Sequence, residues 1–123
     1  MSAQQIAALV QAALASFKHE APPEGSTRGS PWSEARVLSQ LAKLKDSLVT
    51  PYPQRFVVKD NHEQMTKHPP DEADYWVVAE TNDYLEFYDP RTHEFGLADR
   101  GTDDALPSTI GVRGDLIGVF CAR

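Results

Sequence analysis

The sequence predicts a single α+β domain in which two amino-terminal helices pack on a mainly antiparallel sheet of about five to six strands. Its 123 residues are enough for one domain with one core, and a chain of this size needs no disulfide or metal to hold it. Apolar residues recur every three to four positions up to about residue 48, as in amphipathic helices. From residue 54 the apolar period falls to two, which is typical of strands.

The two helices are expected at residues 3–18 and 31–48. Ser2 is a suitable N-cap for the first helix, which ends before Ala21 and the two prolines that follow. Residues 19–30 are expected to form a loop. Ser30 is a suitable cap and Pro31 a suitable first residue for the second helix, which ends before Thr50 because a residue that precedes proline avoids the helical conformation.

The strands are expected at residues 55–59, 74–81, 84–89, 94–98, 109–112 and 116–122, separated by polar loops at 60–73 and 100–108. The last of these strands is apolar on both faces, which indicates a central place in the sheet. It is expected to pair with residues 109–112 through a turn at residues 113–115, Arg-Gly-Asp. Cys121 lies in this apolar run, so we expect a buried packing thiol rather than a nucleophile.

Two turns set the expected register of the central three-stranded meander. Asn82 and Asp83 form a two-residue hairpin turn that pairs Val78 with Phe87 and Trp76 with Asp89. A second turn from Asp89 to His93, with His93 in the left-handed conformation, pairs Phe87 with Phe95 and Leu85 with Leu97. This register puts six apolar side chains on one face, towards the helices: Trp76, Val78, Leu85, Phe87, Phe95 and Leu97.

The opposite face of the meander is the candidate site. In this register it presents tyrosines beside carboxylates, and amphipathic tyrosines are enriched in protein interfaces. We therefore expect this face to be exposed and to bind a partner. The residues expected to make the contact are Asp83, Tyr84, Glu86, Tyr88 and Glu94.

Charge is distributed unevenly along the chain. Residues 60–104 hold thirteen acidic and three basic residues, a net charge of −10, whereas the whole chain carries −6. Such a segment repels nucleic acid and attracts basic partners. We therefore expect a protein partner with a basic surface and no nucleic acid, and the sequence leaves the oligomeric state open.

Motifs for catalysis, metals and membranes are absent from the sequence. His62 and His68 lie six residues apart in an expected loop, a spacing that does not favour a metal site, and no glycine-rich phosphate loop precedes a helix. We expect no metal, no cofactor and no enzymatic activity. With no basic leader and no apolar run of about 20 residues, we expect a cytoplasmic protein that does not contact a membrane.

The acidic, aromatic hairpin at residues 76–90 resembles those of bacterial immunity proteins, which neutralise toxins delivered between bacteria. The resemblance covers about an eighth of the chain. It implies a non-enzymatic inhibitor that covers the active site of a cognate cytosolic toxin, with affinity from a few desolvated anchors. Two other classes stay open: a secretion chaperone, phage-encoded factor or other adaptor, and a small enzyme or small-ligand-binding domain.

Overall fold

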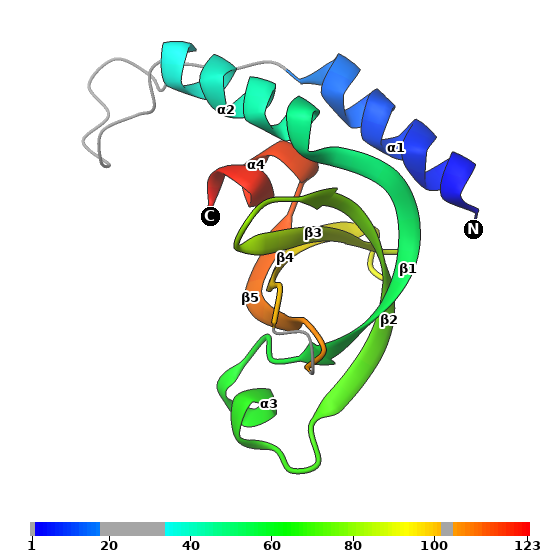
Figure 1. The fold of residues 1–123 in the computed structure, drawn as a ribbon, viewed down its shortest axis with the longest axis vertical. Helices are drawn as coiled ribbons and strands as arrows, with labels where there is room; N and C mark the ends of the chain where they lie inside the picture. Colours follow the sequence, from blue (N-terminus) through cyan, green and yellow to red (C-terminus); the bar gives the residue numbers. More distant parts are fainter. Residues whose placement is uncertain (1, 18–33, 102–104) are drawn as a thin grey trace.

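The computed structural model describes residues 2–17, 34–101 and 105–123, which form four helices and five strands (Figure 1). The expected loop at 19–30, the cap at Ser30 and the start at Pro31 lie outside the described residues. In chain order the elements are α1 Ala3–Ser16, α2 Glu34–Ser47, β1 Leu48–Val58, α3 His62–Thr66, β2 Asp71–Glu80, β3 Tyr84–Asp89, β4 Glu94–Asp99, β5 Ser108–Gly114 and α4 Leu116–Cys121.

The strands form an antiparallel meander that curls into a small closed barrel in the order β1-β2-β3-β4-β5. Closure comes from one parallel pairing, Val57 of β1 with Ser108 of β5, which the bond from the Val57 N–H to the Pro107 carbonyl (2.9 Å) supports. β1 is the longest strand and curves around the barrel from the helices to the opposite end, where α3 lies (Figure 1). The α+β class is confirmed, and the sheet is a barrel rather than an open layer.

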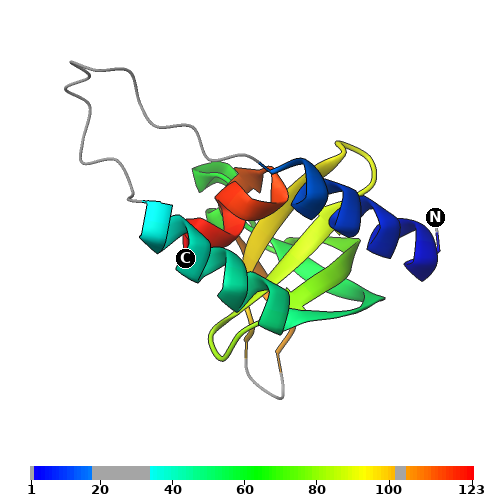
Figure 2. The same ribbon diagram turned by 90° about the horizontal axis from the view of Figure 1, so that it is seen from above.

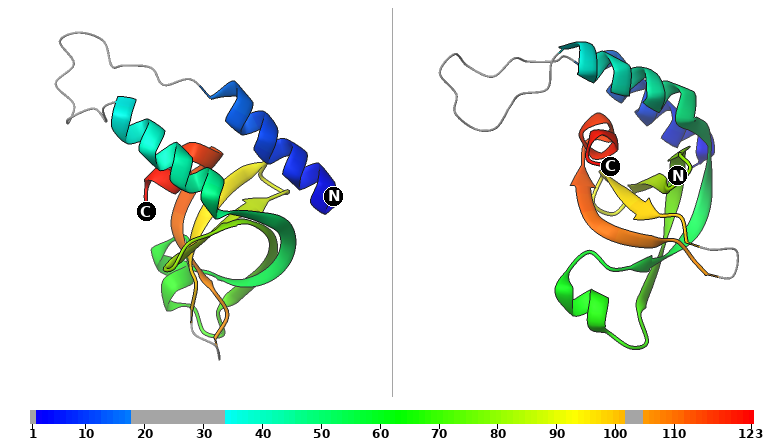
Figure 3. Two further views of the ribbon diagram at one scale, coloured as in Figure 1. Left: turned by 45° about the horizontal axis from the view of Figure 1, so that its top comes forward. Right: turned by 60° about the vertical axis from the view of Figure 1, so that its left-hand side comes forward.

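Three helices lie together on one side of the barrel (Figure 2). α4 contacts both α1 and α2 and lies against β4, so the two amino-terminal helices flank the carboxy-terminal one (Figure 3). The expected position of the two amino-terminal helices against the sheet is therefore only part of the arrangement. The helix that fills the space between them comes from residues predicted to be a strand.

The core has two parts because both faces of the central strands are buried. Inside the barrel, Phe56, Tyr75 and Phe87 pack ring against ring with centroids 4.6–5.6 Å apart, so side chains fill the interior. The second part lies between the outer face of the barrel and the helices. It includes Ile6, Leu44, Val78, Tyr88, Phe95, Leu97 and Phe120.

Gly96 shows how closely the interior is packed. A Cβ atom at this position would lie 2.3 Å from the ring of Phe87, which is far inside van der Waals contact. Gly96 pairs with Phe87 across the strands, so a residue without a side chain makes room for the ring. Ala98, the next residue of β4 that faces the interior, is also small.

Side chains cap the helices as their sequences suggest. Ser2 and Gln5 form a reciprocal capping box on α1, with the Ser2 N–H donating to Gln5 Oε1 at 2.7 Å. Asn61 caps α3, and Asp115 caps α4 by accepting from the Gly118 N–H at 3.0 Å. The N-cap at Ser2 is confirmed.

The expected register of the meander is correct only near the first turn. Thr81 donates its N–H to the Tyr84 carbonyl, and Glu80 pairs with Leu85 as expected. A β-bulge between Val77 and Ala79 then shifts the pairing by one residue, so that Phe87 faces Val77 rather than Val78. Trp76 pairs with Tyr88 and not with Asp89.

The pairing across the second turn, between β3 and β4, also differs from the expected register by one residue. The His93 N–H donates to the Asp89 carbonyl at 2.9 Å, and Asp89 pairs with Glu94, so Phe87 faces Gly96 instead of Phe95. Leu85 correspondingly pairs with Ala98 instead of Leu97. The left-handed conformation of His93 is confirmed, with φ 58°.

These shifts divide the predicted apolar face between the two parts of the core. Leu85 and Phe87 point into the barrel, whereas Val78, Phe95, Leu97 and the partly buried Trp76 pack towards the helices. The prediction of one apolar face was wrong, because a shift of one residue moves a side chain to the other side of a sheet.

Residues 116–122 were predicted as a strand and instead form helix α4. Asp115 starts the helix, so the expected hairpin turn at residues 113–115 is also wrong. The buried residues Leu116, Ile117, Val119 and Phe120 follow helical spacing, and burial on nearly every side hid that period in the sequence. Cys121 lies on this helix and is partly buried, and burial raises its pKa.

The remaining differences are at element boundaries. β1 begins at Leu48 rather than at residue 55 and includes Pro51 and Pro53. α3 is a single turn of helix inside the expected loop at 60–73.

Candidate functional site

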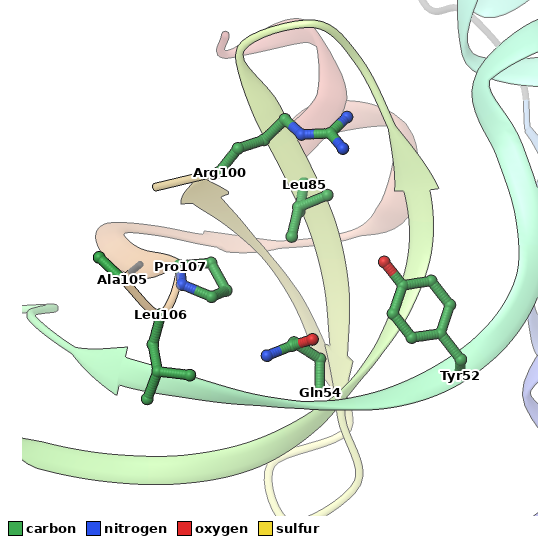
Figure 4. Close-up of a pocket in the computed structure, with 7 residues that line it drawn as sticks. All are labelled: Tyr52, Gln54, Leu85, Arg100, Ala105, Leu106 and Pro107. Atoms are coloured by element: carbon green, nitrogen blue, oxygen red, sulfur yellow. The ribbon is translucent and has the colours of Figure 1, made fainter. Parts of the chain in front are cut away.

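A pocket of about 440 Å³ opens at one end of the barrel, and we call it the barrel mouth (Figure 4). Its walls come from the middle of β1, the start of β3 and the segments on either side of residues 102–104. The lining residues are Tyr52, Gln54, Leu85, Arg100, Ala105, Leu106 and Pro107.

Tyr52 and Glu80 form the most perturbed polar pair at the barrel mouth. The Tyr52 hydroxyl donates to Glu80 Oε1, and the two side chains come from neighbouring strands, β1 and β2. Burial, together with this bond to a carboxylate, raises the pKa of Tyr52 to about 12. Tyr52 is therefore a neutral phenol at physiological pH, and its proton is already engaged.

Arg100 lies on the other side of the barrel mouth, directly after β4. Its Nη1 donates to the Thr81 carbonyl at 2.7 Å, and its backbone N–H donates to the Asp83 carbonyl at 3.3 Å. These bonds tie the end of β4 to the turn between β2 and β3. They hold the guanidinium over Leu85 (Figure 4).

Proline protects the free edge of β1 that borders the barrel mouth. The Val57 N–H points towards β5. Alternate residues of a strand direct their backbone nitrogens to the same edge, so the nitrogens of Arg55 and Pro53 point that way too. Pro53 has no N–H to leave unpaired, and Gln54 Nε2 donates to the Arg55 carbonyl at 2.8 Å. This edge is poorly suited to accept an additional strand, so contacts at the barrel mouth depend on side chains.

A second, more apolar hollow of about 620 Å³ lies beside the barrel mouth and shares Ala105 and Leu106 with it. We call it the side hollow. Met65, Leu106 and Ile110 line it with 54%, 36% and 37% of their surfaces exposed, which is high for large apolar residues. Two neighbouring depressions, one polar and one apolar, thus open on the same part of the surface.

The structure does not bring the five predicted site residues together on an exposed face. Glu86 is 2% exposed and Tyr88 4% exposed, and Tyr84 is partly buried against the core beneath the helices. The expected exposure of this face is wrong, because the side of β3 that carries these residues is covered by the helical layer. Asp83 is exposed at the β2–β3 turn, and Glu94 lies at the far end of the hairpin, opposite Asp89.

Glu86 is an unusual residue in this core. Both of its carboxylate oxygens are buried and have no hydrogen-bond partner. Burial, with a smaller contribution from the nearby Asp115 carboxylate, raises the pKa of Glu86 well above its usual value. These surroundings favour the neutral form of the carboxyl group over the charged one.

The other polar centre is built around Arg113, at the end of β5. Its guanidinium donates to Asp60 Oδ2 at 3.0 Å, to Asp89 Oδ2 at 2.9 Å and to the Tyr75 hydroxyl at 3.1 Å. Burial would lower the Arg113 pKa, but the bonds to Asp89 and Asp60 raise it above its usual value. Every nitrogen of this guanidinium has a partner, so the cluster links four segments of the barrel, while Asp60 Oδ1 is buried in it without a hydrogen-bond partner.

Two properties of the described residues bear on other kinds of site. Within residues 2–17, 34–101 and 105–123, no three His, Cys, Asp or Glu side chains come close enough to hold a metal ion. None of the helices in those ranges has the length and apolar character that crossing a bilayer requires.

Comparison with known proteins found no match: no family model, no curated protein and no solved structure was significantly similar to this chain. The candidate site therefore depends on the geometry of this chain alone.

Proposed function

We propose that this protein is a non-enzymatic binding protein of the immunity type, which neutralises a toxin by covering a basic active site with the surface around the barrel mouth. The observation that carries the proposal is the pairing of a polar pocket with an adjacent, more apolar hollow. Glu80 accepts from Tyr52 at the barrel mouth, the exposed Asp83 lies in the turn whose backbone accepts from Arg100, and the exposed Asp99 lines the side hollow. Apolar centres with polar rims are typical of protein interfaces.

Charge favours a basic partner. Residues 60–104 carry a net charge of −10, and they contribute Leu85 and Arg100 to the barrel mouth and Met65, Asp99 and Gly101 to the side hollow. A field of this sign accelerates association with a basic surface and weakens binding to nucleic acid. The exposed side chains of Met65, Leu106 and Ile110 supply apolar area that the partner would desolvate.

The filled barrel also favours surface contact. Phe56, Tyr75 and Phe87 occupy the interior, so the barrel does not enclose a ligand in the manner of larger barrels.

A second candidate function, binding of a small molecule, is favoured by the polar groups of the barrel mouth itself. Tyr52, Gln54 and Arg100 would then fix the orientation of that molecule.

Co-expression tests the proposed function. Immunity proteins are encoded beside their toxins, so the neighbouring reading frame expressed alone is expected to arrest growth, and this chain is expected to restore it. Growth arrest that this chain does not relieve would refute the immunity role, and so would a neighbouring product that is harmless.

A further inference from the structure

The side chain of Glu86 enters the core between the barrel and the helices. Glu86 pairs with Ala79 of β2 and Leu97 of β4, which both belong to that core, and directly opposed residues project from the same face of a sheet. Glu86 is 2% exposed, and neither of its carboxylate oxygens has a hydrogen-bond partner among the described residues. A charge at this place would therefore have no hydrogen bond to compensate it.

The charges nearest to Glu86 come from α4 and the residues beside it. Burial is the main reason that the pKa of Glu86 is raised, the Asp115 carboxylate at the start of α4 adds to the shift, and Arg123 opposes it. The Arg123 guanidinium is engaged elsewhere, because it donates to the Phe120 carbonyl at 3.0 Å and to Gln40 Oε1 at 2.6 Å. Ionisation of Glu86 would thus place two carboxylates close together beneath and beside α4.

The other elements around Glu86 contribute little charge. α1 carries no charged residue, and Arg36 of α2 acts on the Cys121 thiol, whose pKa is raised by burial and to a smaller extent by Asp115 and Glu86. On β3 itself the neighbours on this face are Tyr84 and Tyr88, and the Tyr88 hydroxyl is paired with His93 Nδ1 at 3.0 Å. These surroundings favour a neutral carboxyl group.

α4 is the part of this layer that depends most on packing. It has six residues, and a helix of this length is not stable on its own. Four buried side chains hold it between α1, α2 and β4 (Figure 2): Leu116, Ile117, Val119 and Phe120. The barrel is held instead by its backbone ladders and by the bonds of Arg113, so α4 can move without opening the sheet.

We infer that α4 is a pH-dependent cover of the barrel, which stays docked while Glu86 is protonated and is released when Glu86 ionises. Release admits water to the carboxylate and separates it from Asp115. The interior of the barrel faces the other way and keeps its packing. This inference goes beyond the proposed function and does not depend on it, because no residue that lines the barrel mouth contacts α4 through a bond described above.

The direction of the pH dependence follows from the raised pKa of Glu86 in the docked state. Below the ordinary carboxyl range Glu86 is protonated in both the docked and the released state, so docking is fully favoured there. As the pH rises towards the docked-state pKa, the released state loses its proton first, and docking weakens. Release is therefore expected on the alkaline side.

Amide hydrogen exchange of the full chain at pH 5 and pH 8, with each rate divided by the intrinsic rate at that pH, tests this inference. The reporters are Val119 and Ala122, whose N–H groups donate to carbonyls at the start and in the middle of α4, and Val57, whose N–H closes the barrel. We expect the protection of Val119 and Ala122 to fall at least about tenfold at pH 8, and that of Val57 to change less than about twofold. An equal loss at all three amides, or no loss in α4, would overturn the inference.

Two further measurements assign the effect to Glu86. Glu86→Gln keeps the shape of the side chain and cannot ionise, so α4 is expected to be equally protected at both pH values, whereas the control Glu94→Gln keeps the loss at pH 8. In the unaltered chain, the carboxyl ¹³C signal of Glu86 is expected to titrate over the same pH interval in which α4 loses protection. A pH-dependent loss that persists in Glu86→Gln, or a Glu86 signal that titrates in the ordinary carboxyl range, would show that Glu86 does not control α4.

Discussion

Glu86 is the residue whose chemistry fits its surroundings least well. A buried polar group without a partner costs about 1–3 kcal/mol, and a charged one costs more. Both oxygens of Glu86 are in this position, in the layer between β3 and the helices. The fold therefore tolerates this carboxyl group at the expense of stability.

Replacing Glu86 by methionine is expected to stabilise the protein, and by more at pH 8 than at pH 5. The folded-state pKa of Glu86 is raised, so the unfolded chain loses this proton at a lower pH than the folded chain does. Stability therefore falls as the pH rises from the usual carboxyl range towards the folded-state pKa. Methionine has similar bulk and no charge, and we expect a gain of about 1 kcal/mol or more at pH 8.

Urea unfolding at both pH values measures this effect. Glu63→Met is the control, because Glu63 is exposed on α3 and its replacement is expected to change stability by similar amounts at both pH values. A pH-independent effect of Glu86→Met would show that the carboxyl group is not held neutral in the folded chain.

Gly96 provides a second test at the level of single residues. Gly96→Ala places a methyl group 2.3 Å from the Phe87 ring, and overpacking of this kind costs about 1–3 kcal/mol. We expect Phe87→Leu to relieve the clash, so that Gly96→Ala costs less in the Phe87→Leu background than alone. A double-mutant cycle from chemical denaturation measures the coupling, and strictly additive effects would contradict this packing.

At the level of elements, α4 shows why a local sequence pattern can mislead. The run from Leu116 to Cys121 is apolar throughout, and such a short run fits a buried strand as well as a buried helix. The feature that decides between them is Asp115, whose side chain caps the helix by accepting from the Gly118 N–H. An acid before an apolar run is a helix-start signal, and at Asp115 this signal is the correct one rather than that of a turn.

Removing this cap is expected to weaken α4. Asp115→Ala should lower the free energy of unfolding by about 1 kcal/mol, the usual value of an N-cap. Asp115→Asn keeps an acceptor at the same position and is expected to retain most of the stability. If alanine and asparagine are equally destabilising, the cap is not what stabilises the start of α4.

β2 shows the limit of reasoning from an alternating pattern. The turn at Asn82 and Asp83 could be predicted, and the pairs next to it follow from that turn. The bulge near Val78 has no signature in the sequence, because Val77, Val78 and Ala79 fit a buried strand in either register. Because the bulge adds one residue to β2, each residue of β2 beyond it lies on the opposite side of the sheet from the one that the sequence predicts.

At the level of the whole molecule, the barrel mouth depends on contacts between distant parts of the chain. Tyr52, Leu85 and Arg100 belong to different strands or strand ends, and no local pattern links them. In the sequence, Pro51 and Pro53 predict only the end of a helix. In the structure they belong to β1, where residues without an N–H suit a free strand edge. The fold class and α1 could be predicted from local periodicity and capping, whereas the candidate site follows from closure of the barrel.

The central claim is that the surface around the barrel mouth meets a basic partner, and the affinity of the purified pair under charge reversal tests it most directly. Asp83 is exposed at the rim, so Asp83→Lys should weaken binding at least about tenfold and leave the melting temperature nearly unchanged. Asp46→Lys, an equal charge change on the exposed face of α2, should weaken it less than twofold. Full affinity in Asp83→Lys, or a larger loss in Asp46→Lys, would contradict the claim.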